Sequence, residues 1–78
     1  MNIHKNQILC QFCRDLGTEL EKFRIEKGLS KKEAASLAGL NEARLLKWIE
    51  QGNPFVLYRL PELIDAYHLR VKLEARDD

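Results

Sequence analysis

The stretch from Ser30 to Glu50 most constrains the fold, because it carries start and stop signals for two short helices in close succession. Ser30 is a favourable N-cap, and Glu33 stands three residues later, so the two side chains can satisfy each other's free backbone amides in a capping box. A first helix is therefore predicted to begin after Ser30. Helical spacing predicts an inward face made of Ala34, Leu37 and Ala38, with Ala35 small enough to let another helix approach closely.

A tight turn is predicted to follow this helix. Gly39 can adopt the positive φ that a sharp exit demands, and Asn41 offers a second N-cap, so the turn should span only about three residues. The second helix is predicted from Glu42 to about Glu50, ended by the left-handed Gly52. Its inward residues are predicted to be Leu45, Trp48 and Ile49. Two short helices joined in this way are typical of a helix-turn-helix unit.

A longer helix is predicted before this unit. Apolar residues recur at intervals of three and four, which predicts a helix from near Lys5 to Lys27. Gly17 interrupts the pattern at a cost of about 1 kcal/mol relative to Ala. Residues 1–15 are therefore predicted to form a helical extension, either a separate helical turn or an added arm. Residues 16–68 are predicted to form the helix-turn-helix domain.

Two prolines shape the segment after the unit. Asn53-Pro54 offers a cap followed by a proline suited to a first helical turn. Pro61 interrupts the next apolar stripe, so either one helix begins a few residues after Pro54 or two short helices meet at Leu60-Pro61. We favour a last helix from Pro61 to His68. The chain is then an all-α bundle of about five helices.

The tail, residues 69–78, changes its period. Its apolar residues alternate strictly with polar ones, which is typical of a β-strand. A lone strand cannot satisfy its own amides and carbonyls, and the chain offers no second strand, so the natural partner is the same strand of another copy. The predicted contacts of this homodimer are Leu69, Val71 and Leu73.

The charges are plentiful but balanced, with thirteen Lys and Arg residues against twelve Asp and Glu residues. No overall basic field favours indiscriminate nucleic-acid binding, so any DNA-binding surface must be local. No apolar run approaches the roughly 20 residues that cross a bilayer, and residues 1–9 are too polar for a signal peptide. We therefore expect a cytoplasmic protein with no membrane partner.

Cys10 and Cys13 form a Cys-x-x-Cys pair, which indicates metal or redox chemistry only where further ligands or a thioredoxin-like setting is present. Neither is visible in the sequence. At helical spacing we expect two reduced, metal-free cysteines. The chain also lacks a convergent carboxylate pair and a glycine-rich phosphate loop, so we expect neither an enzyme nor a cofactor.

From Leu16-Gly17 to its end, the chain resembles the Cro/repressor-type (XRE) helix-turn-helix family. The residues that carry the resemblance are Ala35, Gly39, Leu40, Leu45 and Trp48. Because of its tail, the chain is most similar to the small HipB-like antitoxin repressors. The resemblance implies a lambda-repressor-like fold and a homodimer joined through a two-chain sheet. It also implies a transcriptional repressor that binds a double-stranded DNA operator and acts as the antitoxin of a cognate toxin protein.

The resemblance also assigns DNA-binding positions. Lys31 and Lys32, at the start of the first short helix, match residues that hold phosphate. The outward face of the second helix, where the family places base-reading residues, corresponds to Asn41, Glu42, Ala43, Arg44, Leu46 and Lys47. Glu42 could accept from a cytosine amino group, Ala43 could touch a thymine methyl, and Lys47 could reach guanine or phosphate. Glu42 also repels phosphate, and Leu46 is expected to be an exposed apolar group.

The ion pair that joins the first helix to the second short helix in this family is expected to use a different acidic residue here. An Arg at the position of Arg24 usually pairs with a Glu near the end of the second short helix, but Ile49 stands at that position here. Glu50 lies one residue on, about 100° further round the helix. We therefore expect Arg24 to contact Glu50 or Glu33, and Ile49 to pack inward.

A protein-interaction module is the alternative function. Leu46, Ile49 and the long first helix would then form an apolar surface that binds a toxin or another regulator, with little DNA binding by the chain itself. The scaffold hosts more than one role, because a fold does not determine a function. An antitoxin could combine both activities.

Overall fold

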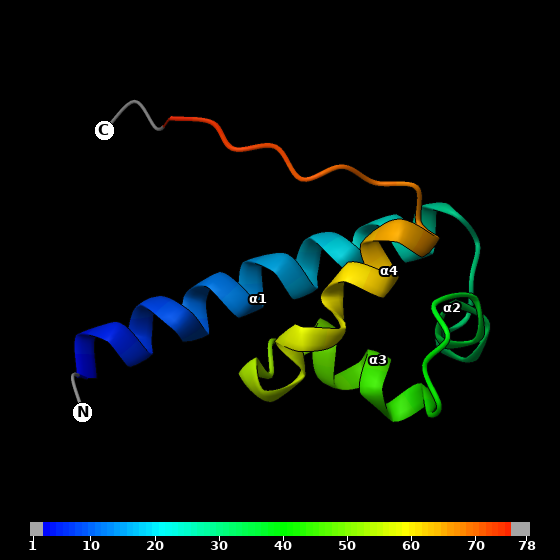
Figure 1. Ribbon diagram of the computed structural model, residues 1–78, viewed down its shortest axis with the longest axis horizontal. Coiled ribbons are helices and arrows are strands. Elements are labelled where there is room, and N and C mark those ends of the chain that lie inside the picture. Colours follow the sequence, from blue (N-terminus) through cyan, green and yellow to red (C-terminus); the bar gives the residue numbers. More distant parts are fainter. Residues whose placement is uncertain (1–2, 76–78) are drawn as a thin grey trace.

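Four α-helices and one 3₁₀-helix make up the chain in the computed structural model, which describes residues 3–75. They are α1 (Ile3–Glu26), α2 (Lys31–Leu37), α3 (Ala43–Glu50), the 3₁₀-helix η1 (Pro54–Arg59) and α4 (Leu60–Ala66). Figure 1 shows α1 as a long rod, with the other helices gathered around its C-terminal half and the N-terminal turns reaching beyond them. No helix among the described residues is long and apolar enough to cross a membrane.

The helix boundaries follow local hydrogen bonds. The capping box at α2 is confirmed, since the Ser30 amide donates to Glu33 at 2.9 Å and the Glu33 amide donates to the Ser30 hydroxyl at 3.0 Å. Asn53 caps η1 by accepting from the Phe55 amide at 2.9 Å. The predicted cap at Asn41 is wrong, because Glu42 is the N-cap of α3 and its side chain makes no capping hydrogen bond.

The helix α1 is continuous through Gly17, so residues 1–15 are not a separate element where the structure describes them. Gly17 is buried where α1 meets the end of α3. A Cβ at this position would lie 2.5 Å from the carbonyl oxygen of Ile49 and 2.7 Å from that of Glu50. Only glycine lets the two backbones approach this closely. Gly17 therefore lowers the helix propensity of α1 but allows α3 to pack against it.

The core is built from small residues on α2 and large ones on the other helices. Its fully or almost fully buried members are Leu20, Ala34, Ala35, Ala38, Leu40, Leu46, Ile49, Val56, Leu60, Leu63 and Tyr67. The predicted inward position of Leu37 is wrong, because 62% of this residue is exposed. At 100° per residue the three alanines of α2 share one face, and Leu37 lies well to the side of it.

A part-buried ion pair joins α1 to the end of α3. The Arg24 Nε atom lies 2.8 Å from a Glu50 carboxylate oxygen, and Arg24 also donates to the Leu29 carbonyl at 2.8 Å. The expected contact with Glu50 and the inward packing of Ile49 are both confirmed. The hydrogen bond with Glu50 raises the pKa of Arg24. The pKa of Glu50 is raised too, mainly by burial, although the Arg24 guanidinium acts in the opposite direction.

The C-terminal part differs most from the prediction. Two short helices, η1 and α4, meet at Leu60 as the favoured alternative expected, but the last helix runs from Leu60 to Ala66 rather than from Pro61 to His68. Residues 69–75 form neither helix nor strand, and the described chain contains no strand, because a strand needs a paired neighbour that a single copy does not supply. Figure 1 shows this tail running back alongside α1. Residues 76–78 of the predicted strand and tail lie outside the described residues.

For Gly17→Ala, helix propensity and the close contact with α3 predict opposite changes in the free energy of unfolding. Helix propensity alone predicts that Gly17→Ala raises the free energy of unfolding by about 1 kcal/mol. We expect a loss of about 1–3 kcal/mol, because the new methyl overlaps two carbonyl oxygens of α3. Urea denaturation measures the change, with the exposed neighbour Thr18→Ala as a control that leaves the midpoint nearly unchanged. A Gly17→Ala protein more stable than wild type would contradict the expectation.

The buried hydroxyl of Tyr67 generates a pH-dependence test. In the described part of the chain this hydroxyl has no hydrogen-bond partner, and burial raises the pKa of Tyr67 from 10.0 to about 12. The unfolded chain therefore ionises first. The contribution of Tyr67 to stability is complete below pH 10 and is lost as the pH rises toward 12.

Tyr67→Phe should remove this alkaline loss and leave stability at pH 7 unchanged or higher by about 1 kcal/mol, because the hydroxyl is unpaired. Urea denaturation of both proteins from pH 7 to 11.5 measures the difference. Stability profiles that stay parallel above pH 10 would show that Tyr67 does not titrate as described.

Candidate nucleic-acid interface

The connection between α2 and α3 is a five-residue segment, Ala38 to Glu42, which is longer than the predicted turn of about three residues. Gly39 has the expected positive φ of 71°, and the Leu40 amide donates to the Ala35 carbonyl at 2.9 Å. This hydrogen bond closes the end of α2, and buried Leu40 anchors the segment in the core. The angle between α2 and α3 is therefore set by the backbone as well as by core packing.

The outward face of α3 contains fewer of the expected base-reading residues than the resemblance implies. Ala43, Arg44 and Lys47 are exposed as expected, but the predicted exposure of Leu46 is wrong because this side chain is fully buried. Leu46 and Ile49 are three residues apart and share the face that meets the core, which leaves Leu45 and Trp48 half-buried at its edge. Asn41 and Glu42 are exposed just before the helix.

Arg44 is tied to both of its neighbours on this face. Its guanidinium forms an exposed ion pair with Glu42 and lies 5.6 Å from the centre of the Trp48 ring. The acidic residue expected to repel phosphate is thus paired with a cation. Lys47 forms no ion pair in the described part of the chain, so its ammonium is available to a ligand.

The start of α2 is less suited to an anion than the resemblance implies. Lys31 and Lys32 are exposed, and neither forms an ion pair among residues 3–75. The capping box, however, already occupies two of the local amides, and hydrogen bonds from Ser30 lower the pKa of the Glu33 carboxyl. Phosphate binding here would depend on the two lysine ammonium groups, which attract phosphate as compact point charges.

Sequence reasoning missed Arg59 as a part of this surface. Its guanidinium donates to the Gly39 carbonyl at 3.3 Å and pairs with Glu62 at 3.2 Å, and it lies 5.9 Å from the centre of the Tyr58 ring. Arg59 therefore links η1 and α4 to the turn between α2 and α3. No spacing in the sequence indicated this, because its partner at the turn is a backbone carbonyl twenty residues away.

The remaining candidates lie elsewhere. Cys13 is buried and Cys10 is exposed, and both are free thiols. Burial, with a smaller effect from Cys10, raises the pKa of the Cys13 thiol. No group of three potential metal-ligating side chains occurs among the described residues. In the tail, Leu69 is half-buried, whereas Val71 and Leu73 are exposed.

The surface of α3 and its N-cap thus offers two cations, one alanine methyl and one paired carboxylate. No protein-family model matches the chain, and no curated protein matches it. The resemblance to the Cro/repressor-type family therefore rests on the residue pattern of the sequence and not on a matched relative.

Proposed function

We propose that the chain is a sequence-specific DNA-binding transcriptional regulator, and specifically a repressor. The observation that carries the proposal is the exposed stripe of Ala43, Arg44 and Lys47 on α3, next to a short helix α2 and held by buried contacts to α1. A short helix with basic and small residues on its free face fits the major groove, while the helix before it crosses the phosphate backbone.

The residues divide into two roles in this proposal. Arg44 and Lys47 reach guanine edges or phosphate, and Ala43 contacts a thymine methyl. Lys31 and Lys32 neutralise phosphates, and Asn41 donates or accepts at the start of α3. Glu42 keeps Arg44 in place through their ion pair until DNA competes for the guanidinium. The protein needs no cofactor and catalyses no reaction in this role.

Homodimerisation and an antitoxin role belong to the same proposal. A two-fold dimer reads two half-sites about one helical turn of DNA apart, which raises affinity without new kinds of contact. The exposed alternating residues Val71 and Leu73 support pairing of the tails as strands between two copies. We place this activity in the cytoplasm, where the chain would repress its own operon and bind a cognate toxin.

A protein-interaction module remains the second candidate, on a surface that is only partly the expected one, because α1 has exposed apolar residues whereas Leu46 and Ile49 are buried. Leu46 and Ile49 are buried and cannot contribute. Large apolar residues are instead exposed on η1, where Phe55 is 85% exposed and Tyr58 is 69% exposed. Exposed aromatic side chains are common anchors of protein interfaces, and these two would receive a toxin or another regulator.

Lys47→Ala tests the role of α3 in DNA binding. A lost phosphate contact should lower affinity for all sequences and reduce the salt slope by about one, whereas a lost base contact should cost roughly 1–3 kcal/mol at one position. Mobility shifts on the chain's own promoter over a salt series measure both. Lys22→Ala, an exposed lysine on α1, is the control and should bind like wild type. Unchanged binding by Lys47→Ala would exclude α3 as the reading element.

Leu73→Pro tests pairing of the tails. Leu73 is 93% exposed in the single chain, and proline removes an amide that a strand ladder requires. Sedimentation equilibrium should show a weaker dimer for this variant and an unchanged one for Leu37→Ala, an exposed leucine on α2. A Leu73→Pro dimer as tight as that of wild type would show that the tails do not pair.

A further inference from the structure

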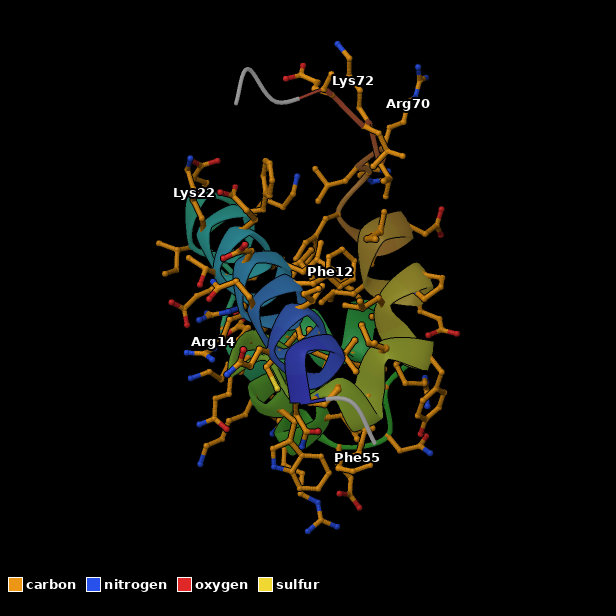
Figure 2. The ribbon with its side chains drawn as sticks, turned by 90° about the vertical axis from the view of Figure 1, so that its left-hand side faces the viewer. Phe12, Arg14, Lys22, Phe55, Arg70 and Lys72 are labelled. Carbon is orange, nitrogen blue, oxygen red and sulfur yellow. The ribbon has the colours of Figure 1, made fainter. Side chains whose placement is uncertain are left out.

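The N-terminal half of α1 presents apolar side chains that the rest of the described chain leaves about half exposed. Ile8, Leu9 and Phe12 are 56%, 40% and 53% exposed. They lie on the turns of α1 that reach beyond the other helices in Figure 1. Figure 2 places Phe12 on the side of α1 that faces α4, with the tail above it. We call these three residues the arm.

The C-terminal half of α1 borders an apolar groove, whereas the N-terminal half carries protruding apolar side chains. The groove has a volume of about 350 Å³ and lies between α1, α4 and the tail. Its apolar lining consists of Leu16, Leu20, Phe23, Ile64, Leu69 and Val71. It is open rather than filled, because the tail runs beside α1 without packing against it along its length, and Val71 is 65% exposed.

The arm and the groove lie on one continuous stripe of the same helix. At 100° per residue, Phe12, Leu16 and Phe23 fall within about 40° of one another around the axis of α1. The protruding side chains occupy the N-terminal part of this stripe, and the groove begins one turn later at Leu16. Two copies of α1 placed antiparallel across a two-fold axis near Leu16 would each bring Phe12 opposite Leu20 of the other. Such a surface is self-complementary, as a two-fold interface requires.

The charges beside the stripe also complement one another. Asp15 follows Phe12 by three residues and therefore lies on the same side of α1, where it accepts a hydrogen bond from Gln11 at 2.9 Å. Arg70 and Lys72 of the tail line the groove together with Glu19 of α1, and Lys72 also pairs with Glu74 at 3.6 Å. An arm that enters the groove of another copy brings its Asp15 toward these two cations. The arm of a second copy therefore matches the groove in apolar character, and its Asp15 comes near the two tail cations.

We propose that two copies of the chain dimerise by reciprocal insertion of the arm of each copy into the groove of the other. Two equal contacts form, each made of Ile8, Leu9 and Phe12 from one copy and the groove of the partner copy. The arrangement does not depend on DNA binding. Val71 lines the groove and is also one of the alternating tail residues, whereas Leu73 does not line the groove, so Leu73 tests pairing of the tails separately from the arm.

Two variants test the arm and the groove separately in the full chain. Phe12→Glu places a charge on the arm, and Val71→Lys places one on the groove wall; both positions are exposed, so both proteins should fold. Sedimentation equilibrium should show dimer dissociation constants raised roughly tenfold or more for each variant. Leu37→Glu, which changes an exposed apolar residue on α2, is the matched control and should dimerise like wild type. Circular dichroism and urea denaturation check the fold of each variant.

Mixing the two variants gives the sharpest test. In a mixed dimer, the intact arm of the Val71→Lys copy enters the intact groove of the Phe12→Glu copy, and the second contact joins a Glu to a Lys. The equimolar mixture should therefore dimerise more strongly than either variant alone. A Phe12→Glu protein that dimerises like wild type, or a mixture no stronger than its components, would overturn the proposal. Loss of the dimer in Leu73→Pro together with its retention in Phe12→Glu would assign dimerisation to the tails alone.

Discussion

The junction between α1 and the end of α3 is the contact on which the rest of the structure depends. Gly17 has no side chain to keep the two backbones apart. The ion pair between Arg24 and Glu50 joins the same two helices. The Glu50 side chain is only 2% exposed, so its carboxylate has given up water for the guanidinium. Removing one partner of such a pair is typically more costly than the net gain from forming it, because the other charge is left buried and unpaired.

This junction decides which side of α3 is free. With its C-terminal end held against Gly17, α3 turns Leu46 and Ile49 into the core and leaves Ala43, Arg44 and Lys47 outside. A base-reading surface on this chain therefore has two cations and a small residue rather than the apolar Leu46. The Glu42 carboxylate is paired with Arg44, which reduces the repulsion of phosphate that an isolated carboxylate would cause.

The two halves of α1 have different environments, because the other helices pack mainly on its C-terminal half. The helices after residue 28 can cover only as much of α1 as their short lengths allow, so the N-terminal turns keep apolar residues uncovered (Figure 1). Large exposed apolar side chains on a small chain typically mark an interaction surface. The groove beside the C-terminal half of α1 has the apolar lining that these residues of a second copy would need in the proposed dimer.

The sequence by itself determined the features that depend on near neighbours in the chain. The capping box of Ser30 and Glu33, the left-handed Gly39, the Asn53 cap and the helical stripe of α1 all follow from residues a few positions apart. The contact of Arg24 with Glu50 was one of two alternatives that the family resemblance predicted, the other being Glu33. Local signals failed at Asn41, where a good capping residue is not used because α3 begins one residue later than predicted.

Only the tertiary structure decided which residues of a helix face the core and what Gly17 does. Leu37 and Leu46 are equally apolar, yet the first is exposed and the second is fully buried, because the positions of the neighbouring helices select the face. The role of Gly17 depends on carbonyls more than thirty residues away, and the role of Arg59 depends on a carbonyl twenty residues away. The tail was predicted as a strand from its alternation, but strand formation needs a partner, and the described single chain contains none. Alternation sets which side chains share a face, whereas only a second backbone supplies the hydrogen bonds of a sheet.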